Sequence, residues 1–303
     1  MIADVAIHLL FVLALPPLLI GVIGKTKAFF GGRVGPPFVQ PYRDLLRLWR
    51  KGEVISTTTT WVFRAGPVVM LATALVASLL VPFGSRPAPL SFAGDLVLLA
   101  YLFGLSRFFT VAAAMDTGSP FEGMGAAREA TFAALAEPAL FLALLTLVRA
   151  SGSLSLGTML GSGLAHAWAT ASASLVFVVV SLFVVLLVES SRVPFDDPAT
   201  HLELTMIHEV MVLDHSGPML GVIHYAAALK LLVLGAIVAR LAVPVSTGSL
   251  PLDWLVFAAS MLAVAVTIGV VESVMARLRL VQVPLLLVGA CLLSGFALVL
   301  FTR

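Results

Sequence analysis

Long apolar stretches alternate with shorter polar connections along almost the whole chain. A helix needs about 20 apolar residues to cross the ~30 Å hydrocarbon layer of a bilayer. Eight stretches reach that length, at residues 3–24, 62–82, 94–115, 130–149, 168–189, 218–241, 252–275 and 281–302. The pattern therefore predicts an all-α polytopic membrane protein with eight transmembrane helices, which form a single membrane domain over residues 1–303.

The first polar connection contains a segment with a different periodicity. Within residues 37–51, apolar and aromatic side chains recur on one helix face and the charged side chains occupy the other. The apolar face consists of Tyr42, Leu45, Leu46 and Trp49. This is the pattern of an amphipathic helix that lies in the headgroup plane. Such a helix either orients the protein at the surface or forms a lip over the entrance of a cavity.

The composition excludes a soluble fold. Of the 303 residues, 60% are hydrophobic and only 11% are charged, whereas roughly a quarter of the residues of a soluble domain are charged. The partner of this surface is therefore the lipid bilayer, and no nucleic-acid partner is expected.

Lysine and arginine beside the spans predict the orientation, because they gather on the cytoplasmic side. Thirteen lie on the side of the loops after the first, third, fifth and seventh helices: Lys25, Lys27, Arg33, Arg43, Arg47, Arg50, Lys51, Arg64, Arg107, Arg128, Arg192, Arg277 and Arg279. Four lie on the opposite side: Arg86, Arg149, Arg240 and Arg303. The imbalance predicts a multi-pass protein of the cytoplasmic membrane with both termini outside.

One segment, residues 189–209, interrupts the apolar pattern with five acids, two histidines and an arginine. Such a dense polar run in an otherwise apolar membrane protein predicts a water-containing cavity at the membrane surface. Its charged and imidazole side chains are candidates for the cavity wall and for contact with a partner: Glu189, Arg192, Asp196, Asp197, His201, Glu203, His208 and Glu209.

Further ionisable residues lie inside the predicted spans, where a charge costs several kcal/mol unless it is paired or hydrated. Glu137 lies about eight residues into its helix, roughly 12 Å deep at 1.5 Å per residue. Arg107 lies at a similar depth, so we predict that these two are neighbours. Lys230 lies near the midplane, and Glu272 lies about a turn inside its helix. Each is either part of a proton relay or one half of a structural ion pair, and Glu272 could also snorkel to the interface.

The segment 116–129, predicted as a connection, carries three more carboxylates above Glu137, namely Asp116, Glu122 and Glu129. Together with the 189–209 segment they predict a run of acids from the cytoplasm to the membrane interior. The solvation of an ordinary loop explains the outermost of them equally well.

Metal and cofactor sites are not expected in this chain. The His208-Glu209 pair begins like the helix of a zinc protease, but Val212 stands where the second histidine is needed. Cys291 is the only cysteine, and an iron–sulfur cluster needs about four thiolate ligands. Any electron-transfer centre that this protein serves is therefore expected in another chain.

Three stretches carry a resemblance to a known family. The run 189–198 reads Glu-x-x-Arg-x-Pro-Phe-Asp-x-Pro, residues 214–217 read Asp-His-Ser-Gly, and residues 33–36 read Arg-Val-Gly-Pro. Together they resemble the eight-helix membrane subunit at the heel of respiratory complex I, the NADH dehydrogenase subunit 1 family. Quinone-linked members continue with an acid-rich run, whereas residues 199–209 here do not. With the run 115–121, this departure resembles the homologous subunit of membrane-bound [NiFe] hydrogenases of the formate hydrogenlyase and hydrogenase-4 type.

The resemblance implies a subunit without redox centres of its own, with the [NiFe] and iron–sulfur clusters in the hydrogenase large and small subunits on its cytoplasmic face. It also implies antiporter-like membrane subunits at its side. It places Arg33 and the 189–198 run next to the cavity and the cluster-bearing partner, and it assigns Glu137 to the proton path. The alternatives are a quinone-site subunit of a complex I-like oxidoreductase, a structural membrane anchor and a stand-alone transporter.

Overall fold

The protein is described by a computed structural model that covers residues 2–196 and 206–302. These residues form an all-helical fold without a strand in either range. The helices are α1 (Ile2–Phe30), α2 (Gln40–Trp49), α3 (Trp61–Leu80), α4 (Asp95–Asp116), α5 (Pro120–Ser151), α6 (Leu156–Met159), α7 (Gly163–Glu189), α8 (Gly217–Ala242), α9 (Leu250–Val274) and α10 (Val283–Thr302), with a single 3-10 turn, η1 (Glu209–Val212).

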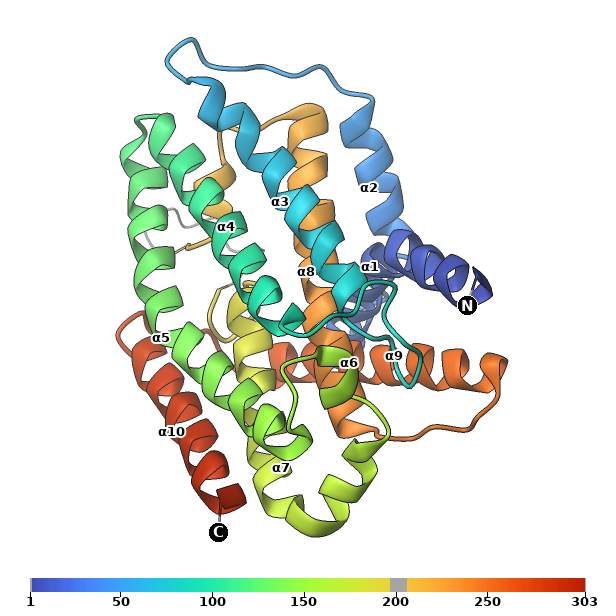
Figure 1. The fold of residues 1–303 in the computed structure, drawn as a ribbon. Coiled ribbons are helices and arrows are strands. Elements are labelled where there is room, and N and C mark those ends of the chain that lie inside the picture. The colour runs from blue at the N-terminus through green and yellow to red at the C-terminus, as the bar shows by residue number, and fades with distance from the viewer. Residues whose placement is uncertain (1, 197–205, 303) are drawn as a thin grey trace.

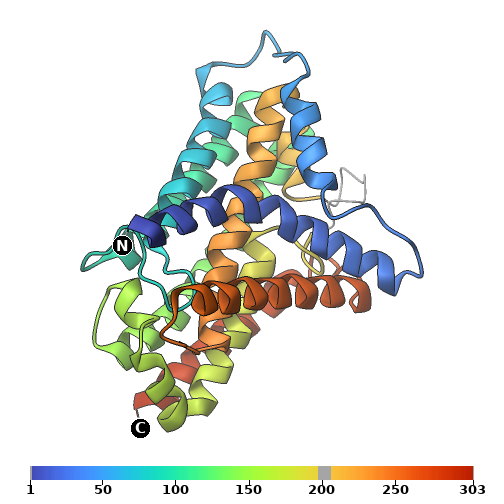
Figure 2. The same cartoon turned by 90° about the vertical axis from the view of Figure 1, so that its right-hand side faces the viewer.

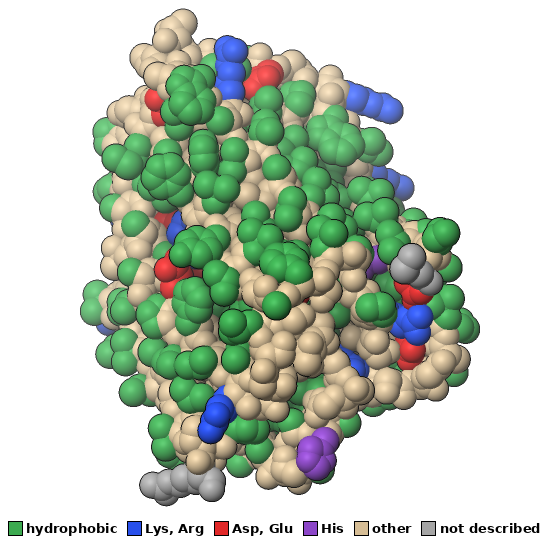
Figure 3. All heavy atoms as spheres, in the orientation of Figure 1, with side chains coloured by type: hydrophobic (Ala, Val, Ile, Leu, Met, Phe, Trp, Pro, Cys, Tyr) green, Lys and Arg blue, Asp and Glu red, His purple; other side chains and the backbone are tan. Residues whose placement is uncertain are grey.

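The predicted membrane architecture is confirmed. Among the described residues, eight helices are long and apolar enough to cross a bilayer, and each coincides with one predicted span. Figure 3 shows apolar side chains spread over much of the face in view, as expected for a surface that meets lipid. The chain is a multi-pass membrane protein, and α2 lies inside the predicted interfacial segment.

The start of α5 differs from the prediction by ten residues, because the helix begins at Pro120 and not at residue 130. Ser119 occupies the N-cap position, and Pro120 has the fixed φ that suits the first helical position. Glu122 then places a carboxylate in the first turn, where the helix dipole favours it. Glu122 and Glu129 therefore lie on a helix rather than in a connecting loop.

Several helices are longer than a perpendicular crossing requires. At 1.5 Å per residue, the 29 residues of α1 extend over roughly 43 Å and the 32 residues of α5 over roughly 48 Å. Helices of this length fit a ~30 Å layer by tilting. Figure 2 shows α1 and α9 side by side, both crossing α8 at a large angle.

Helix α8 lies at the centre of this arrangement (Figure 1) and is the most extensively buried of the spans. It packs against α1, α2, α3, α7 and α9. A second group consists of α5, α7 and α10, which pack on one another at one side. Side chains from α4, α5, α7 and α8 thus meet in the interior.

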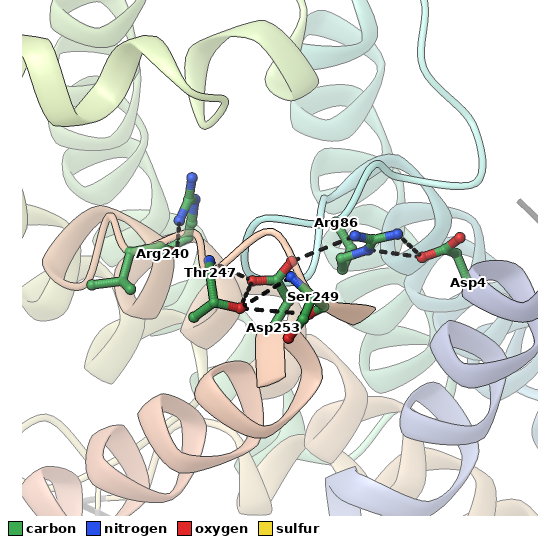
Figure 4. A network of polar contacts seen from close by, with 7 residues as sticks. Asp4, Arg86, Arg240, Thr247, Ser249 and Asp253 are labelled. Atoms are coloured by element: carbon green, nitrogen blue, oxygen red, sulfur yellow. Dashed lines mark hydrogen bonds and ion pairs between the residues drawn. The ribbon is translucent and has the colours of Figure 1, made fainter. Parts of the chain in front are cut away.

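A polar network fixes α1 and α9 to the α3–α4 connection on the side opposite α2 (Figure 4). Arg86 donates from Nε to Asp4 Oδ1 over 2.8 Å, and its Nη1 lies 3.4 Å from Asp253 Oδ2. Asp253 also accepts from the backbone and the hydroxyl of Thr247, both over 2.8 Å. The hydrogen bond to Asp4 raises the pKa of Arg86, so this cation stays charged and holds the helix pair in place.

Candidate functional site

The interior of the bundle contains a guanidinium surrounded by carboxylates. Arg107 of α4, whose side chain is only 10% exposed, donates from Nη1 to Glu137 Oε1. Its Nη2 lies 2.5 Å from Glu189 Oε1, and its Nε lies 3.5 Å from Glu129 Oε1. The predicted contact between Arg107 and Glu137 is confirmed, and one arginine joins α4, α5 and α7.

Lys230 extends this cluster to α8. Its Nζ lies 2.7 Å from Glu189 Oε2 and 5.7 Å from the centroid of the Phe103 ring. Glu189 is therefore held between two cations, with a side chain that is 4% exposed. Three carboxylates and two cations sum to −1 when all five groups are ionised, and in a low-dielectric interior such an excess negative charge is costly.

Three cavities adjoin this cluster in series. The first has a volume of about 330 Å³ and lies between α1, α2, α8 and the segment after α7. It shares Ser190, Ser191 and His208 with a second, of about 40 Å³, which Arg107 and Glu189 also line. The second has room for about three water molecules.

Arg107 and Glu189 also line the third cavity, a groove of about 600 Å³ between α4 and α5. Glu137 lies in this groove beside Tyr101 and Phe108, with 46% of its side chain exposed. The charged cluster thus separates an interior chamber from a groove on the outer face of the described chain. A carboxylate on each side of Arg107 is open to a cavity that can hold water.

A second buried ion cluster lies beside the 330 Å³ cavity. Glu272 of α9 is fully buried, 2.9 Å from Lys27 Nζ of α1 and 3.7 Å from Arg192 Nη1. The alternative that Glu272 snorkels to the interface is therefore wrong, because the two cations retain it inside. Burial lowers the pKa of Arg192, and the charges of Glu272 and Glu209 act against this shift. Arg192 and Glu209 both line the 330 Å³ cavity.

Three of the candidate carboxylates accept hydrogen bonds from backbone N–H groups. Asp116 accepts from the N–H groups of Thr60 and Phe63 over 2.6 and 3.3 Å, at the start of α3. Glu122 is fully buried and accepts from the backbone of Asp214 over 3.0 Å. These two carboxylates hold chain segments together.

The third is Asp196, which is buried rather than presented at the surface. It accepts from the N–H groups of Ile207 and His208 over 3.1 and 2.9 Å, and it pairs with Arg277 over 3.2 Å. It therefore fixes the segment that carries His208 to the α9–α10 connection.

The remaining candidates are dispersed. Arg33 lies exposed in the turn after α1. Asp197, His201 and Glu203 lie outside the described residues, so the structure places none of them. Within residues 2–196 and 206–302, no group of three or more histidine, cysteine, aspartate or glutamate side chains could hold a metal ion.

The sequence of the chain matches the profile of the family described as NADH dehydrogenase over residues 3–303. It belongs to that family. Formate hydrogenlyase subunit 4 of Escherichia coli K12 is 31% identical to it over 92% of this chain and 91% of the relative. Hydrogenase-4 component C of the same organism is 32% identical over 88% of this chain and 85% of the relative.

Two further proteins are similar at lower sequence identity. A subunit of the NADH-quinone oxidoreductase of Syntrophotalea carbinolica is 28% identical over 71% of this chain and 67% of the relative. A chain in the structure of the membrane-bound sulfane sulfur reductase, an archaeal respiratory membrane complex, has the same fold, with a TM-score of 0.82 over 98% of both chains at 20% identity.

Sequence reasoning missed several side chains that line the site in this family member. His224 of α8 lines the 330 Å³ cavity, and Thr73 of α3 lines the 40 Å³ one. His224 carries a signal in retrospect, since it is a polar residue within a span and lies on the same helix as Lys230. Thr73 carries none, because its hydroxyl bonds to Val69 O of its own helix, as threonines do in many spans.

Proposed function

We propose that this chain is the membrane subunit of a membrane-bound [NiFe] hydrogenase complex of the formate hydrogenlyase type. In this proposal it anchors the hydrogenase module and couples electron transfer there to the movement of protons, or of sodium ions, through buried carboxylates. Two relatives that are 31% and 32% identical over most of their length, and that are named as a formate hydrogenlyase subunit and a hydrogenase component, support this assignment.

The partners and cofactors follow from the same assignment. The [NiFe] centre and the iron–sulfur clusters belong to the hydrogenase large and small subunits, which dock on the basic side of the membrane. This chain binds none of them, and its lone Cys291 lies in α10. Antiporter-like membrane subunits lie at its side. The basic side is the cytoplasmic side of the inner membrane, which leaves both termini outside.

The observation that carries the coupling proposal is the charged cluster at the boundary between two cavities. Arg107 lines both the 40 Å³ chamber and the groove that holds Glu137. A proton taken up on the chamber side at Glu129 weakens the pairing of that carboxylate to Arg107. Arg107 then interacts more strongly with the two remaining carboxylates, Glu189 and Glu137, which favours release of a proton at Glu137.

The redox step acts on this cluster through the segment after α7. Glu189 is the last residue of α7, and Ser190, Ser191 and Arg192 continue directly into the 330 Å³ cavity. A change of charge or position in a partner above this segment shifts Arg192, which Glu272 and Glu209 hold from the membrane side. Because Arg192 is only three residues after Glu189, a displacement of Arg192 also displaces the Glu189 side chain.

The test is Glu137→Gln in the complete complex, reconstituted in sealed vesicles. Electron transfer by the partner should continue at the wild-type rate, while the number of protons moved per electron falls. Glu137→Asp should restore part of the coupling. Glu53→Gln, at an exposed position, is the matched control and should change neither quantity. If Glu137→Gln moves as many protons per electron as the wild type, the relay assignment is wrong.

A quinone-site subunit is the second candidate, and the 330 Å³ cavity favours it. Pro17 and Leu45 give this cavity an apolar wall on α1 and part of α2, while Asp44, Arg192 and His208 supply polar groups. That profile suits a molecule with a long apolar tail and a polar head. Inhibition of the complex by quinone-site inhibitors, competitive with added quinone, would select this candidate. Insensitivity to them would leave the hydrogenase assignment in place.

A further inference from the structure

The charge of the chain is concentrated in one short stretch. Residues 25–60 contain seven lysines and arginines and two acids, a net charge of +5. The whole chain has a net charge of +2, so the remaining residues carry 2 − 5 = −3. This stretch comprises the last turns of α1, the turn that follows, α2 and the connection to α3. In Figure 2 it forms one edge of the molecule.

Helix α2 is firmly attached at this edge. The Tyr42 hydroxyl donates to Ala14 O of α1. The backbone before α2 approaches α1 so closely that a Cβ on Gly21 would lie 2.3 Å from Phe38 O. At the other end the Trp49 indole lies against Gly221 of α8, where a Cβ would lie 2.9 Å from its Nε1. The inward face of α2 is therefore settled by contacts within the chain.

The outward face of α2 is unpartnered and has a mixed composition. Arg43, Arg47 and Arg50 are exposed, and Leu46 and the outer half of Trp49 are exposed between them. The acid on this helix, Asp44, accepts from Gln40 over 2.9 Å and lies 3.6 Å from Arg47 Nη1. Guanidinium groups that alternate with apolar and indole side chains are typical of helices in the headgroup layer.

The end of α1 continues this surface. Phe29, Phe30 and Val34 are exposed there. Lys25 donates to Val34 O over 2.6 Å and lies 6.0 Å from the centroid of the Phe38 ring. The turn is therefore ordered, and it presents apolar side chains beside the exposed Arg33. A water-facing loop has no physical reason to hold such side chains in place, whereas the interface of a bilayer accommodates them.

We infer that the outward face of α2 and the adjoining tip of α1 bind anionic phospholipid headgroups in preference to zwitterionic ones. The arginines supply charge-assisted hydrogen bonds to the phosphate and to the additional anionic group. Leu46, Trp49 and Phe29 enter the layer between headgroups and acyl chains. Because the inward face of α2 lines the 330 Å³ cavity, the bound lipid lies at the rim of that cavity. This inference does not depend on the proposed function.

The test uses Trp49 as its reporter, in the full-length chain in nanodiscs. Trp61→Phe, Trp168→Phe and Trp254→Phe leave Trp49 as the single tryptophan of the chain. Nanodiscs of phosphatidylglycerol and phosphatidylcholine carry bromine on the acyl chains of one lipid or of the other. Brominated phosphatidylglycerol should quench Trp49 more than brominated phosphatidylcholine at equal mole fraction. Each basic side chain near an anionic surface contributes about five-fold to binding, so Arg43→Gln with Arg47→Gln should lower the preference about twenty-five-fold.

The matched control removes two exposed arginines elsewhere, Arg149→Gln with Arg279→Gln, and should keep the preference. In the protein with both arginines of α2, the preference should also fall as NaCl is raised from about 0.05 to about 0.5 M, because screening shortens the range of the attraction. Equal quenching by the two lipids would overturn the inference and indicate a face covered by protein or water. A preference that salt leaves unchanged, or that the control loses equally, would also overturn it.

Discussion

Glu189→Gln is the substitution to which this structure should be most sensitive. The carboxylate of Glu189 lies 2.5 Å from Arg107 and 2.7 Å from Lys230. Arg107 keeps two other carboxylates when Glu189 is neutralised. Lys230 does not, because Glu189 is the ion-pair partner that the described residues provide for it. The substitution therefore leaves a buried ammonium group without a counter-charge.

The magnitude follows from the distance and the burial. At an effective dielectric constant of ~20, two unit charges 2.7 Å apart attract one another by about 6 kcal/mol. Desolvation of the two ions offsets most of that attraction, so the pair itself contributes little to folding. Removal of one partner is different, since it leaves the desolvation of the other uncompensated and costs about 3–5 kcal/mol. We expect Glu189→Gln to lower the stability of the detergent-solubilised chain by that amount.

The double variant Glu189→Gln with Lys230→Met separates this reasoning from a simple packing defect. It removes both charges, so it should recover most of the loss, with a coupling of about 2–3 kcal/mol between the sites. Thermal and denaturant unfolding of the two single variants and the double variant, followed by circular dichroism, gives the cycle. Glu53→Gln serves as the exposed control and should change stability by less than about 0.5 kcal/mol. If the effects of the two single substitutions simply add, the pairing is not what stabilises this region.

Three further predictions concern the packing around the site. Burial lowers the pKa of His215 to about 4, against about 6.5 in an unfolded chain, so its contribution to stability is complete above pH 6.5 and is lost as the pH falls towards 4. Between pH 7 and pH 5 the wild type should therefore lose about 2 kcal/mol more stability than His215→Phe. Equal losses in the two proteins would contradict this. Gly125→Ala should destabilise the protein by about 1–3 kcal/mol, since its Cβ would lie 2.4 Å from a side chain of η1. Gly123→Ala, two residues earlier with nothing within 4 Å, should stabilise the protein slightly. A lower unfolding midpoint for Gly125→Ala than for Gly123→Ala is the expected result. Gly21→Ala, whose Cβ would lie 2.3 Å from the carbonyl oxygen of Phe38, should make α2 accessible to protease and Gly24→Ala should not; equal cleavage would mean that α2 is not held at this point.

The membrane spans and one contact in the site could be predicted from the sequence because both depend on one-dimensional quantities. A run of about 20 apolar residues is sufficient to identify a span, and depth along a helix follows from counting residues. Depth alone predicts that Arg107 and Glu137 meet, and they do. The start of α5 could not be found in this way, since residues 120–129 include Glu122 and Glu129 and lower the apolar average.

The direction in which each side chain points was beyond sequence reasoning. Each residue turns a helix by about 100°, so depth does not tell whether a carboxylate faces the interior or the outside. Glu137 proved to be half exposed in a groove, whereas Glu272 proved to be fully buried. The role of Asp196 was equally hidden, because the backbone groups that it binds belong to residues 207 and 208, on the far side of the polar segment.

Under the proposed function, the contacts of Arg107 allow one buried arginine to serve a path for protons rather than obstruct it. A permanently charged guanidinium in a membrane needs compensating carboxylates, and Arg107 contacts three, from α5 and α7. A proton that neutralises any one of them leaves Arg107 paired with the other two, so no protonation state leaves the arginine alone in the interior. The arginine thus permits its neighbours to change charge one at a time, which a single ion pair cannot do. Arg107→Lys should keep the cation but lose the simultaneous contacts, because an ammonium group lacks the planar fork that reaches three carboxylates at once. Coupling should then fall even where the protein folds, while Arg128→Lys, whose guanidinium donates to the carbonyl oxygen of Met206, should leave coupling intact. Normal coupling in Arg107→Lys would show that the cluster is merely a structural one.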